Sequence, residues 1–205
     1  MIEVTRDGGV WTVTLNRPDK ANSLTPAMLE DLARIAGEAR EARVFVLTGA
    51  GKVFSAGADL DAAKAGLATS DVWERVSGAI AGLPGLTIAA LNGTLAGGAF
   101  GMALACDLRI AVPEARFFYP VMKLGYLPQP SDPGRLRALV GPARAKLILM
   151  AGARLTAEEA LAFGLVDRVV PREDFADTLQ TLAADTLAAD WEIAQGIKAL
   201  CQRAP

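Results

Sequence analysis

The feature that most constrains the fold is a run of thirty residues, from Ser77 to Cys106, that contains no charged side chain. Its length alone would permit a membrane-spanning helix. Pro84 and Asn92 interrupt the run, however, and its seven glycines would weaken an isolated helix. We therefore expect no membrane span, but a buried strand over residues 87–91, a turn, and a buried helix over residues 99–106.

Short strands and helices alternate along the rest of the chain. The spacing of apolar residues predicts a hairpin from strands 2–6 and 10–15, and a strand over 44–48. A helix is expected after Thr25, with Pro26 at its first position. Later expectations are strands over 108–111, 116–119 and 166–170, a helix from about Ser131, a helix begun by a Thr156–Glu159 capping box and ended by Gly164, and one long helix from about Asp174. This alternation, in 205 residues, indicates one α/β domain.

The composition excludes several kinds of chemistry. The chain has no histidine, which removes Ser-His-Asp and Cys-His machinery and the commonest zinc ligand, so no metal site is expected. Cys106 and Cys201 are isolated and no secretory signal begins the chain, a pattern typical of reduced, buried thiols in a cytoplasmic protein. The net charge of −2, with scattered basic residues, disfavours nucleic acid as a partner.

Two glycine-rich turns are the candidate functional elements. FSAGADL spans Phe54 to Leu60, and NGTLAGGAFG spans Asn92 to Gly101. Each follows a predicted strand, and the first N–H groups of a following helix have no internal partner, so they can bind an anion or a developing oxyanion. We expect Ala58 and Gly98 to supply these groups, with Gly57 and Gly97 allowing the sharp bend. The alternative is that the turns only pack, in a structural or partner-binding protein.

The segments around these turns extend the pattern over nearly the whole chain. They are NRPDKANSLT from Asn16 to Thr25, TGAGKVFSAGADL from Thr48 to Leu60, NGTLAGGAFGMALACDLRIA from Asn92 to Ala111, and LTAEEALAFGLVDRVV from Leu155 to Val170. Jointly they resemble the crotonase family, also called the enoyl-CoA hydratase/isomerase family. The resemblance implies an α/β spiral of ββα units with a helical C-terminal region. Residues 1–150 would form the core with the CoA site and oxyanion hole, and residues 151–205 a short helical region of the same unit.

The same resemblance implies an enzyme of acyl-CoA chemistry, a crotonase-type lyase or isomerase of fatty acid metabolism. A CoA thioester would bind with its carbonyl between the turns, and the N–H groups of Ala58 and Gly98 would stabilise its enolate. The residues expected to hold CoA are Lys20, Ala21, Leu24, Ala56, Gly57, Asp59 and Leu60. For Lys20 a solvated loop lysine is the alternative. CoA would arrive as part of the substrate, with no permanently bound cofactor, and the expected assembly is a homo-oligomer, a trimer.

The sequence departs from the family at the two positions that carry proton-transferring glutamates in the hydratases. These positions are Gly101 and Val121 here, so plain hydration is disfavoured, and isomerisation, decarboxylation or thioester hydrolysis is favoured. Replacement candidates are Asp132, Tyr119 and Tyr126. The alternatives are a helix-start carboxylate for Asp132 and packing residues for the tyrosines.

Three further expectations follow from the resemblance. Asp59 and Asp107 match the family pattern and are expected to be helix-end or structural carboxylates. A catalytically silent acyl-CoA-binding protein is the alternative to an enzyme, because both glutamates are missing. Family members usually continue with helices that complete the acyl pocket and pack between subunits, so we expect either an open acyl site here or a final helix that makes the contact.

Overall fold

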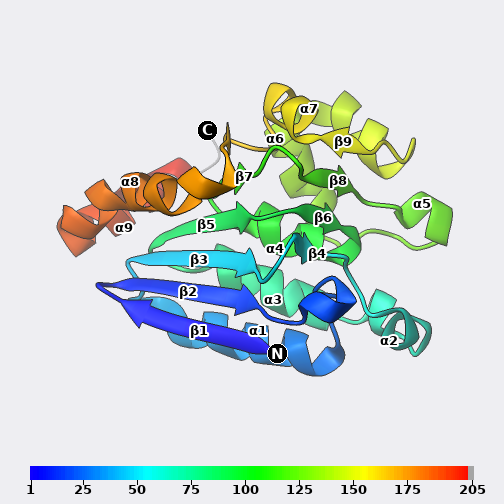
Figure 1. Ribbon diagram of the computed structural model, residues 1–205, viewed down its shortest axis with the longest axis horizontal. Coiled ribbons are helices and arrows are strands. Elements are labelled where there is room, and N and C mark those ends of the chain that lie inside the picture. The colour runs from blue at the N-terminus through cyan, green and yellow to red at the C-terminus, as the bar shows by residue number, and fades with distance from the viewer. Residues whose placement is uncertain (203–205) are drawn as a thin grey trace.

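The larger of two sheets has six strands and forms the centre of the computed structural model, which describes residues 1–202 (Figure 1). Its strands, in spatial order, are β1 (Ile2–Asp7), β2 (Val10–Leu15), β3 (Val44–Gly49), β5 (Leu86–Leu91), β7 (Leu108–Ala111) and β10 (Arg168–Val169). Strands β1 and β2 form the predicted antiparallel hairpin, and the remaining pairs are parallel. The strand expected over residues 166–170 is shorter than predicted, because only Arg168 and Val169 pair with β7.

The smaller sheet contains β4 (Val53–Ser55), β6 (Thr94–Ala96), β8 (Arg116–Phe118) and β9 (Leu155–Thr156). Consecutive strands alternate between the sheets: β3, β5 and β7 lie in the larger sheet, whereas β4, β6 and β8 lie side by side in the smaller one. Each turn of the chain thus adds one strand to each sheet. This is the predicted spiral, and it brings the segments that follow β4 and β6 next to each other.

Nine α-helices cover the sheets within residues 1–202. They are α1 (Pro26–Glu38), α2 (Leu60–Lys64), α3 (Val72–Ala81), α4 (Phe100–Ala105), α5 (Val121–Leu124), α6 (Asp132–Leu149), α7 (Ala157–Phe163), α8 (Phe175–Ala188) and α9 (Trp191–Gln202). Phe45 and Leu47 of β3 face the main core that contains α1 and α3, whereas Val44 and Val46 pack toward α8. Both faces of the strand are buried, which explains its continuous apolar run.

The predicted helix ends are confirmed. The Thr25 hydroxyl accepts the N–H of Met28 at 3.3 Å and begins α1, with Pro26 as its first residue. Thr156 and Glu159 form the capping box of α7, with bonds of 3.1 and 2.8 Å. Gly164 ends that helix at φ 79°, a left-handed conformation that glycine adopts without steric cost.

The prediction of a single long helix from Asp174 is wrong. Two helices, α8 and α9, are separated at Ala189 and Asp190. The Asp190 carboxylate accepts the N–H of Glu192 at 2.8 Å and so begins α9, while the Arg43 guanidinium binds the carbonyls of Thr186 and Ala189 at the end of α8. A new cap inside one amphipathic pattern therefore divides the helix.

The two cysteines differ. Cys106 is buried, and burial raises the pKa of its thiol to about 12, so it is inert. Cys201 is exposed, which corrects the expectation that both thiols are buried.

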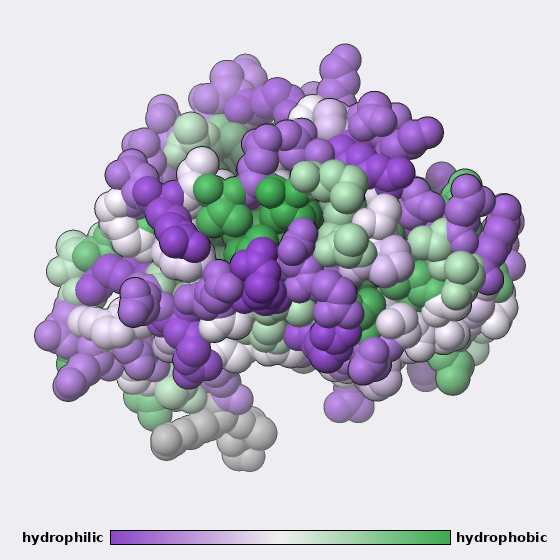
Figure 2. All heavy atoms as spheres, turned by 90° about the horizontal axis from the view of Figure 1, so that it is seen from below, coloured by the Kyte–Doolittle hydropathy of each residue, from purple (hydrophilic) through white to green (hydrophobic). Residues whose placement is uncertain are grey.

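Figure 2 shows the molecule from below, with apolar residues gathered near the middle of a largely hydrophilic face. None of the helices within residues 1–202 has both the length and the apolar character that crossing a bilayer requires.

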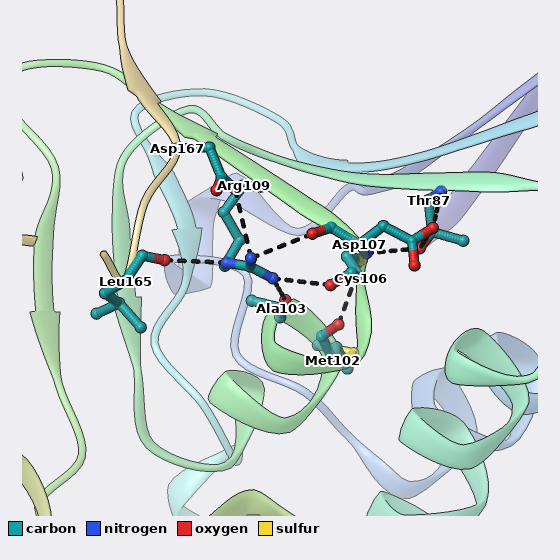
Figure 3. A network of polar contacts seen from close by, with 8 residues as sticks. All are labelled: Thr87, Met102, Ala103, Cys106, Asp107, Arg109, Leu165 and Asp167. Carbon is teal, nitrogen blue, oxygen red and sulfur yellow. Dashed lines mark hydrogen bonds and ion pairs between the residues drawn. The ribbon is translucent and has the colours of Figure 1, made fainter. Parts of the chain in front are cut away.

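A buried polar network fixes the C-terminal end of α4 (Figure 3). Arg109, 2% exposed, donates to the carbonyls of Cys106 at 2.7 Å and Leu165 at 2.9 Å, and lies 3.4 Å from the Asp167 carboxylate. The Asp107 carboxylate accepts the N–H and hydroxyl of Thr87 at 2.8 and 2.9 Å. Asp107 thus has the structural role expected for it. A guanidinium at this position also satisfies carbonyls that the helix end leaves without partners.

Arg109→Lys should destabilise the protein by about 2 kcal/mol, because one ammonium cannot reproduce a buried fork that serves several carbonyls. Urea unfolding measures the change, and exposed Arg137→Lys is the matched control. Equal stability of the two variants would contradict a structural role for the Arg109 network.

Candidate functional site

A cavity of about 240 Å³ lies between the two glycine turns, helix α3 and the segment that follows β8. Ala58 and Gly98 line it from the turns, Trp73 lines it from α3, and Tyr119 and Val121 line it from the segment after β8. Its remaining lining is mostly apolar and includes the exposed side chains of Leu60, Leu124 and Leu127. An apolar cavity with a few polar groups is the usual form of a small-molecule site.

The first turn places Ala58 at this cavity. Gly57 has φ 89°, so it can reverse the chain where a residue with a side chain would be strained. The Leu24 N–H donates to the Gly57 carbonyl at 2.8 Å, and the Asp59 N–H donates to the Leu24 carbonyl at 2.9 Å. Because the flanking groups bond to Leu24, the N–H of Ala58 points to the opposite side.

Buried Ser55 makes this turn rigid. Its hydroxyl donates to the Asn22 carbonyl at 2.8 Å and accepts the Gly57 N–H at 3.1 Å. The Asn22 side chain, which is fully buried, donates to the carbonyls of Ala50 and Val53 at 2.9 and 2.7 Å. Neither residue was singled out from the sequence. Ser55 could have been found as a polar residue between the apolar residues Phe54 and Ala56, because a buried polar side chain must be hydrogen-bonded. Asn22 carries no such signal.

The second turn leads into α4. Gly97 has φ 58°, and Gly98 lies in the helical turn that precedes Phe100. A Cβ on Gly98 would lie 3.2 Å from three atoms of the Trp73 ring, so the indole packs directly against this glycine. The Trp73 ring is held in turn by its own N–H, which donates to the Leu67 carbonyl at 2.8 Å. Trp73 was not among the predicted site residues, because helix α3 was not predicted from the sequence.

The two turns are in direct contact. A Cβ on Gly57 would lie 2.9 Å from the Ala96 carbonyl oxygen and 3.4 Å from the Gly98 nitrogen. Only glycine therefore permits this approach. The structure brings together the two predicted turns at one wall of one cavity, an arrangement in which two backbone N–H groups can serve one oxygen atom.

The loop before α1 lies against the first turn. Ala21 and Asn22 have φ of 50° and 51°, and the Ala21 carbonyl accepts the Ala56 N–H at 3.0 Å. Lys20 is exposed on this loop, whereas Leu24 is fully buried and its N–H and carbonyl are both bonded to the first turn, so Leu24 supports the loop without reaching a ligand. Of the predicted CoA residues, Ala56 and Leu60 line the cavity and Lys20 is exposed on the adjoining loop, whereas Leu24 and Gly57 are buried; their part in CoA binding stays a prediction.

Asp59 begins helix α2. One carboxylate oxygen accepts the N–H groups of Asp61 and Ala62 at 3.2 and 3.4 Å, and the other binds Arg17 at 2.8 Å. The hydrogen bond from Arg17 is the main reason that the pKa of Asp59 lies below its usual value. Both oxygens have partners, as expected for a structural carboxylate; a contribution of Asp59 to CoA binding stays a prediction.

Comparison with known proteins agrees with this geometry. A family model described as enoyl-CoA hydratase/isomerase matches residues 5–204. The chain belongs to the enoyl-CoA hydratase/isomerase, or crotonase, family. A carnitinyl-CoA dehydratase of Salmonella enteritidis is 39% identical over 193 residues, which cover 89% of this chain and 72% of that protein.

Solved structures give the same result. An enoyl-CoA hydratase from Bacillus anthracis superposes with a TM-score of 0.91 and 32% identity, covering 98% of this chain and 82% of that chain. An enoyl-CoA hydratase/carnithine racemase from Magnetospirillum magneticum gives a TM-score of 0.89 at 30% identity, covering 98% and 79% of the two chains. The predicted crotonase fold is therefore confirmed.

The two positions at which the resemblance implies hydratase glutamates are Gly101 and Val121. Val121 lines the cavity and is 8% exposed, but it cannot transfer a proton. Gly101 is buried in α4, and a Cβ there would lie 2.9 Å from Oδ1 of Asp132. An acidic side chain from another helix thus lies beside the backbone of Gly101.

Asp132 and Tyr119 form a buried pair. The Tyr119 hydroxyl donates to Oδ2 of Asp132 at 2.8 Å, and the Tyr119 ring stacks on Phe100 with centroids 5.3 Å apart. Burial raises the pKa of Asp132 to about 7 and raises that of Tyr119 far above its usual value. Tyr126, the third candidate, is 40% exposed at the cavity and does not join this pair.

Proposed function

We propose that this protein binds an acyl-CoA thioester and stabilises the enolate of that thioester through the N–H groups of Ala58 and Gly98. The contact between the two turns at the cavity carries this proposal, because it supports two backbone donors around one oxygen position. Negative charge develops on the thioester oxygen when the α carbon loses a proton. A fixed donor of this kind is worth about 3 kcal/mol in the transition state.

CoA enters this proposal as part of the substrate, with no permanently bound cofactor. The loop from Lys20 to Leu24 and the backbone at Ala56 and Leu60 would hold the nucleotide portion. The hydrogen bond from Ala56 to Ala21 supports this placement, because it joins that loop to the oxyanion turn. A cytoplasmic homotrimer that acts in fatty acid metabolism remains part of the proposal, on the resemblance alone.

The reaction that we favour is isomerisation, decarboxylation or thioester hydrolysis, as in a crotonase-type isomerase or lyase. Standard hydration needs two acid–base groups to hold and activate water, and such groups contribute roughly 10²–10⁴ to the rate each. Gly101 and Val121 supply neither. Enolate formation, in contrast, needs an oxyanion site and one proton carrier.

Calorimetry with butyryl-CoA tests binding, and a panel of acyl-CoA substrates tests turnover. We expect a dissociation constant on the order of 10–100 μM, within the usual range for metabolic enzymes, and turnover of at least one thioester. Failure to bind any acyl-CoA would overturn the proposal.

Lys20→Ala should weaken CoA binding by about threefold at low salt and by less at high salt, because an exposed ammonium acts on phosphate as a screened point charge. Lys146→Ala, exposed on α6, is the matched control. Equal affinities for CoA at low salt would assign Lys20 to the solvated loop and remove it from the site.

A catalytically silent acyl-CoA-binding protein is the second candidate. The absence of a carboxylate at positions 101 and 121 favours it. It predicts acyl-CoA binding with no turnover and no exchange of α protons, which separates it from the enzyme in the same experiments.

A further inference from the structure

The side chains that line the cavity between the glycine turns carry no charge within residues 1–202. Most of them are alanines, leucines and aromatic residues. The polar groups among them belong to Trp73, Tyr119, Tyr126 and Gln129. Which acyl group the cavity can hold therefore depends on whether these four side chains are free to bind it.

The two buried polar groups are already engaged within the protein. The Tyr119 hydroxyl donates to the carboxylate of Asp132 at 2.8 Å, and the Trp73 N–H donates to the Leu67 carbonyl at 2.8 Å. Both residues are only 3% exposed, so neither side chain can turn toward a ligand without breaking its hydrogen bond. Neither donor is free for a ligand, and the two rings add mainly hydrocarbon surface to the cavity.

The other two polar groups lie where the cavity opens to solvent. Tyr126 is 40% exposed, and the partly exposed Gln129 amide donates to the Ala68 carbonyl at 3.4 Å. Positive charge is no closer: Arg154 stacks on the Phe118 ring at 4.2 Å, but it is exposed and does not line the cavity. An oxygen atom on an enclosed acyl group would therefore leave water without gaining a partner.

Trp73, the largest side chain in the lining, closes the side of the cavity formed by α3. Three atoms of its six-membered ring lie 3.2 Å from the position of a Cβ on Gly98, so the ring stands beside the second turn. The bond to the Leu67 carbonyl and the packing of α3 against α1 and α4 hold the ring there. An acyl chain that starts at Gly98 meets a fixed wall in this direction.

The size of the cavity limits the length of the chain. An apolar cavity of about 150 Å³ holds benzene, so a cavity of about 240 Å³ holds on the order of ten non-hydrogen atoms. The carbon, oxygen and sulfur of the thioester take part of this space. The enclosed acyl chain is then limited to about six carbons.

We propose that the cavity selects a short hydrocarbon acyl group over one that carries a carboxylate or a hydroxyl, and that Trp73 sets the limit on its length. This inference rests on the proposed function, because it assumes that the thioester carbonyl lies between Ala58 and Gly98. Burying an unpaired charge costs far more than burying an unpaired hydroxyl, so the carboxylate is rejected most strongly. Among the reactions favoured above, decarboxylation of a carboxylated acyl group fits this cavity least well.

Three thioesters of nearly equal shape test the selection. Isovaleryl-CoA, 3-hydroxybutyryl-CoA and malonyl-CoA carry, on the third acyl carbon, two methyl groups, a methyl and a hydroxyl, and two carboxylate oxygens. By calorimetry, isovaleryl-CoA should bind tightest, 3-hydroxybutyryl-CoA about tenfold more weakly, and malonyl-CoA roughly 100-fold more weakly or worse. The order should persist at high salt, which screens the long-range effect of the extra charge.

A series of straight-chain thioesters tests the role of Trp73. From acetyl-CoA to hexanoyl-CoA, the wild-type affinity should rise roughly fourfold for each buried methylene, and it should rise no further at decanoyl-CoA. Trp73→Phe shortens the wall, so the affinity for decanoyl-CoA relative to butyryl-CoA should increase about fourfold or more. Trp11→Phe on β2, outside the lining, is the matched control and should keep the wild-type ratio.

The outcomes distinguish this inference from the proposed function. Equal affinities for the three thioesters of equal shape would overturn the selection and leave the proposed function intact. A wild-type affinity that keeps rising through decanoyl-CoA would overturn the length limit, whether or not Trp73→Phe folds. Failure of the wild type to bind butyryl-CoA or any other acyl-CoA would overturn the proposed function itself.

Discussion

Replacing Gly57 with alanine should lower the exchange of butyryl-CoA α protons by roughly 10²–10³-fold, the effect of losing one oxyanion donor. The added Cβ would lie 2.9 Å from the Ala96 carbonyl oxygen and 3.4 Å from the Gly98 nitrogen, so the two turns must separate. Alanine would also be strained at φ 89°. Mass spectrometry of the exchanged thioester gives the rate, and calorimetry shows whether butyryl-CoA still binds.

Gly152→Ala is the matched control for backbone strain. Gly152 also has a positive φ, of 69°, but a Cβ there has nothing within 4 Å, and the residue lies between α6 and β9, outside the residues that line the cavity. Both variants should lose stability through backbone strain, and Gly57→Ala more because of its added contact with Ala96, whereas only Gly57→Ala should lose exchange. If Gly57→Ala exchanged as fast as Gly152→Ala, the contact between the turns would have no part in the chemistry.

The turns were predictable because glycine marks them in the sequence. A positive φ and a close backbone approach both demand glycine; Gly57 meets both conditions in the structure, and Gly97 meets the first. The local signals at Thr25, Thr156 and Gly164 were equally informative, since caps and left-handed ends depend on adjacent residues only. These features could be assigned from short segments.

Features that depend on distant residues were not predictable in the same way. The division of α8 from α9 involves Arg43, which is far from Ala189 in sequence and binds its carbonyl. The pairing of Tyr119 with Asp132 and the closeness of Gly101 to Asp132 depend on how α4 and α6 pack. Sequence alone named Asp132 and Tyr119 as candidates, but only the fold relates them to the side chain missing at position 101.

The structure also shows what occupies the space beside Gly101, one of the two positions where the resemblance implies a glutamate. Gly101 could be taken as a simple loss, but a larger residue there would collide with a carboxylate that is already buried. A glutamate introduced at position 101 would therefore have to displace the carboxylate of Asp132.

Asp132→Asn should gain stability relative to the wild type as the pH rises, because burying the ionised carboxylate of Asp132 lowers the free energy of unfolding of the wild type. The folded-state pKa of Asp132 is about 7, above its usual 3.8. Between these values the folded protein binds a proton that the unfolded chain has released, so wild-type stability falls as the pH rises through this window. The loss at high pH is on the order of 4 kcal/mol.

Asparagine does not ionise, so the variant escapes this loss, and the gap between the two free energies of unfolding should widen from pH 4 to pH 8. Urea unfolding at both pH values measures the gap, in which the contributions of all other groups cancel.

Asp59→Asn is a control in which stability should change with pH in the opposite direction. Arg17 lowers the pKa of Asp59, so this variant should be less stable than the wild type at neutral pH, and its stability should approach that of the wild type in acid. A gap that stays constant for Asp132→Asn would mean that Asp132 does not titrate in this range. A widening gap would show that the buried carboxylate of Asp132 titrates and that its ionised form lowers the stability of the fold.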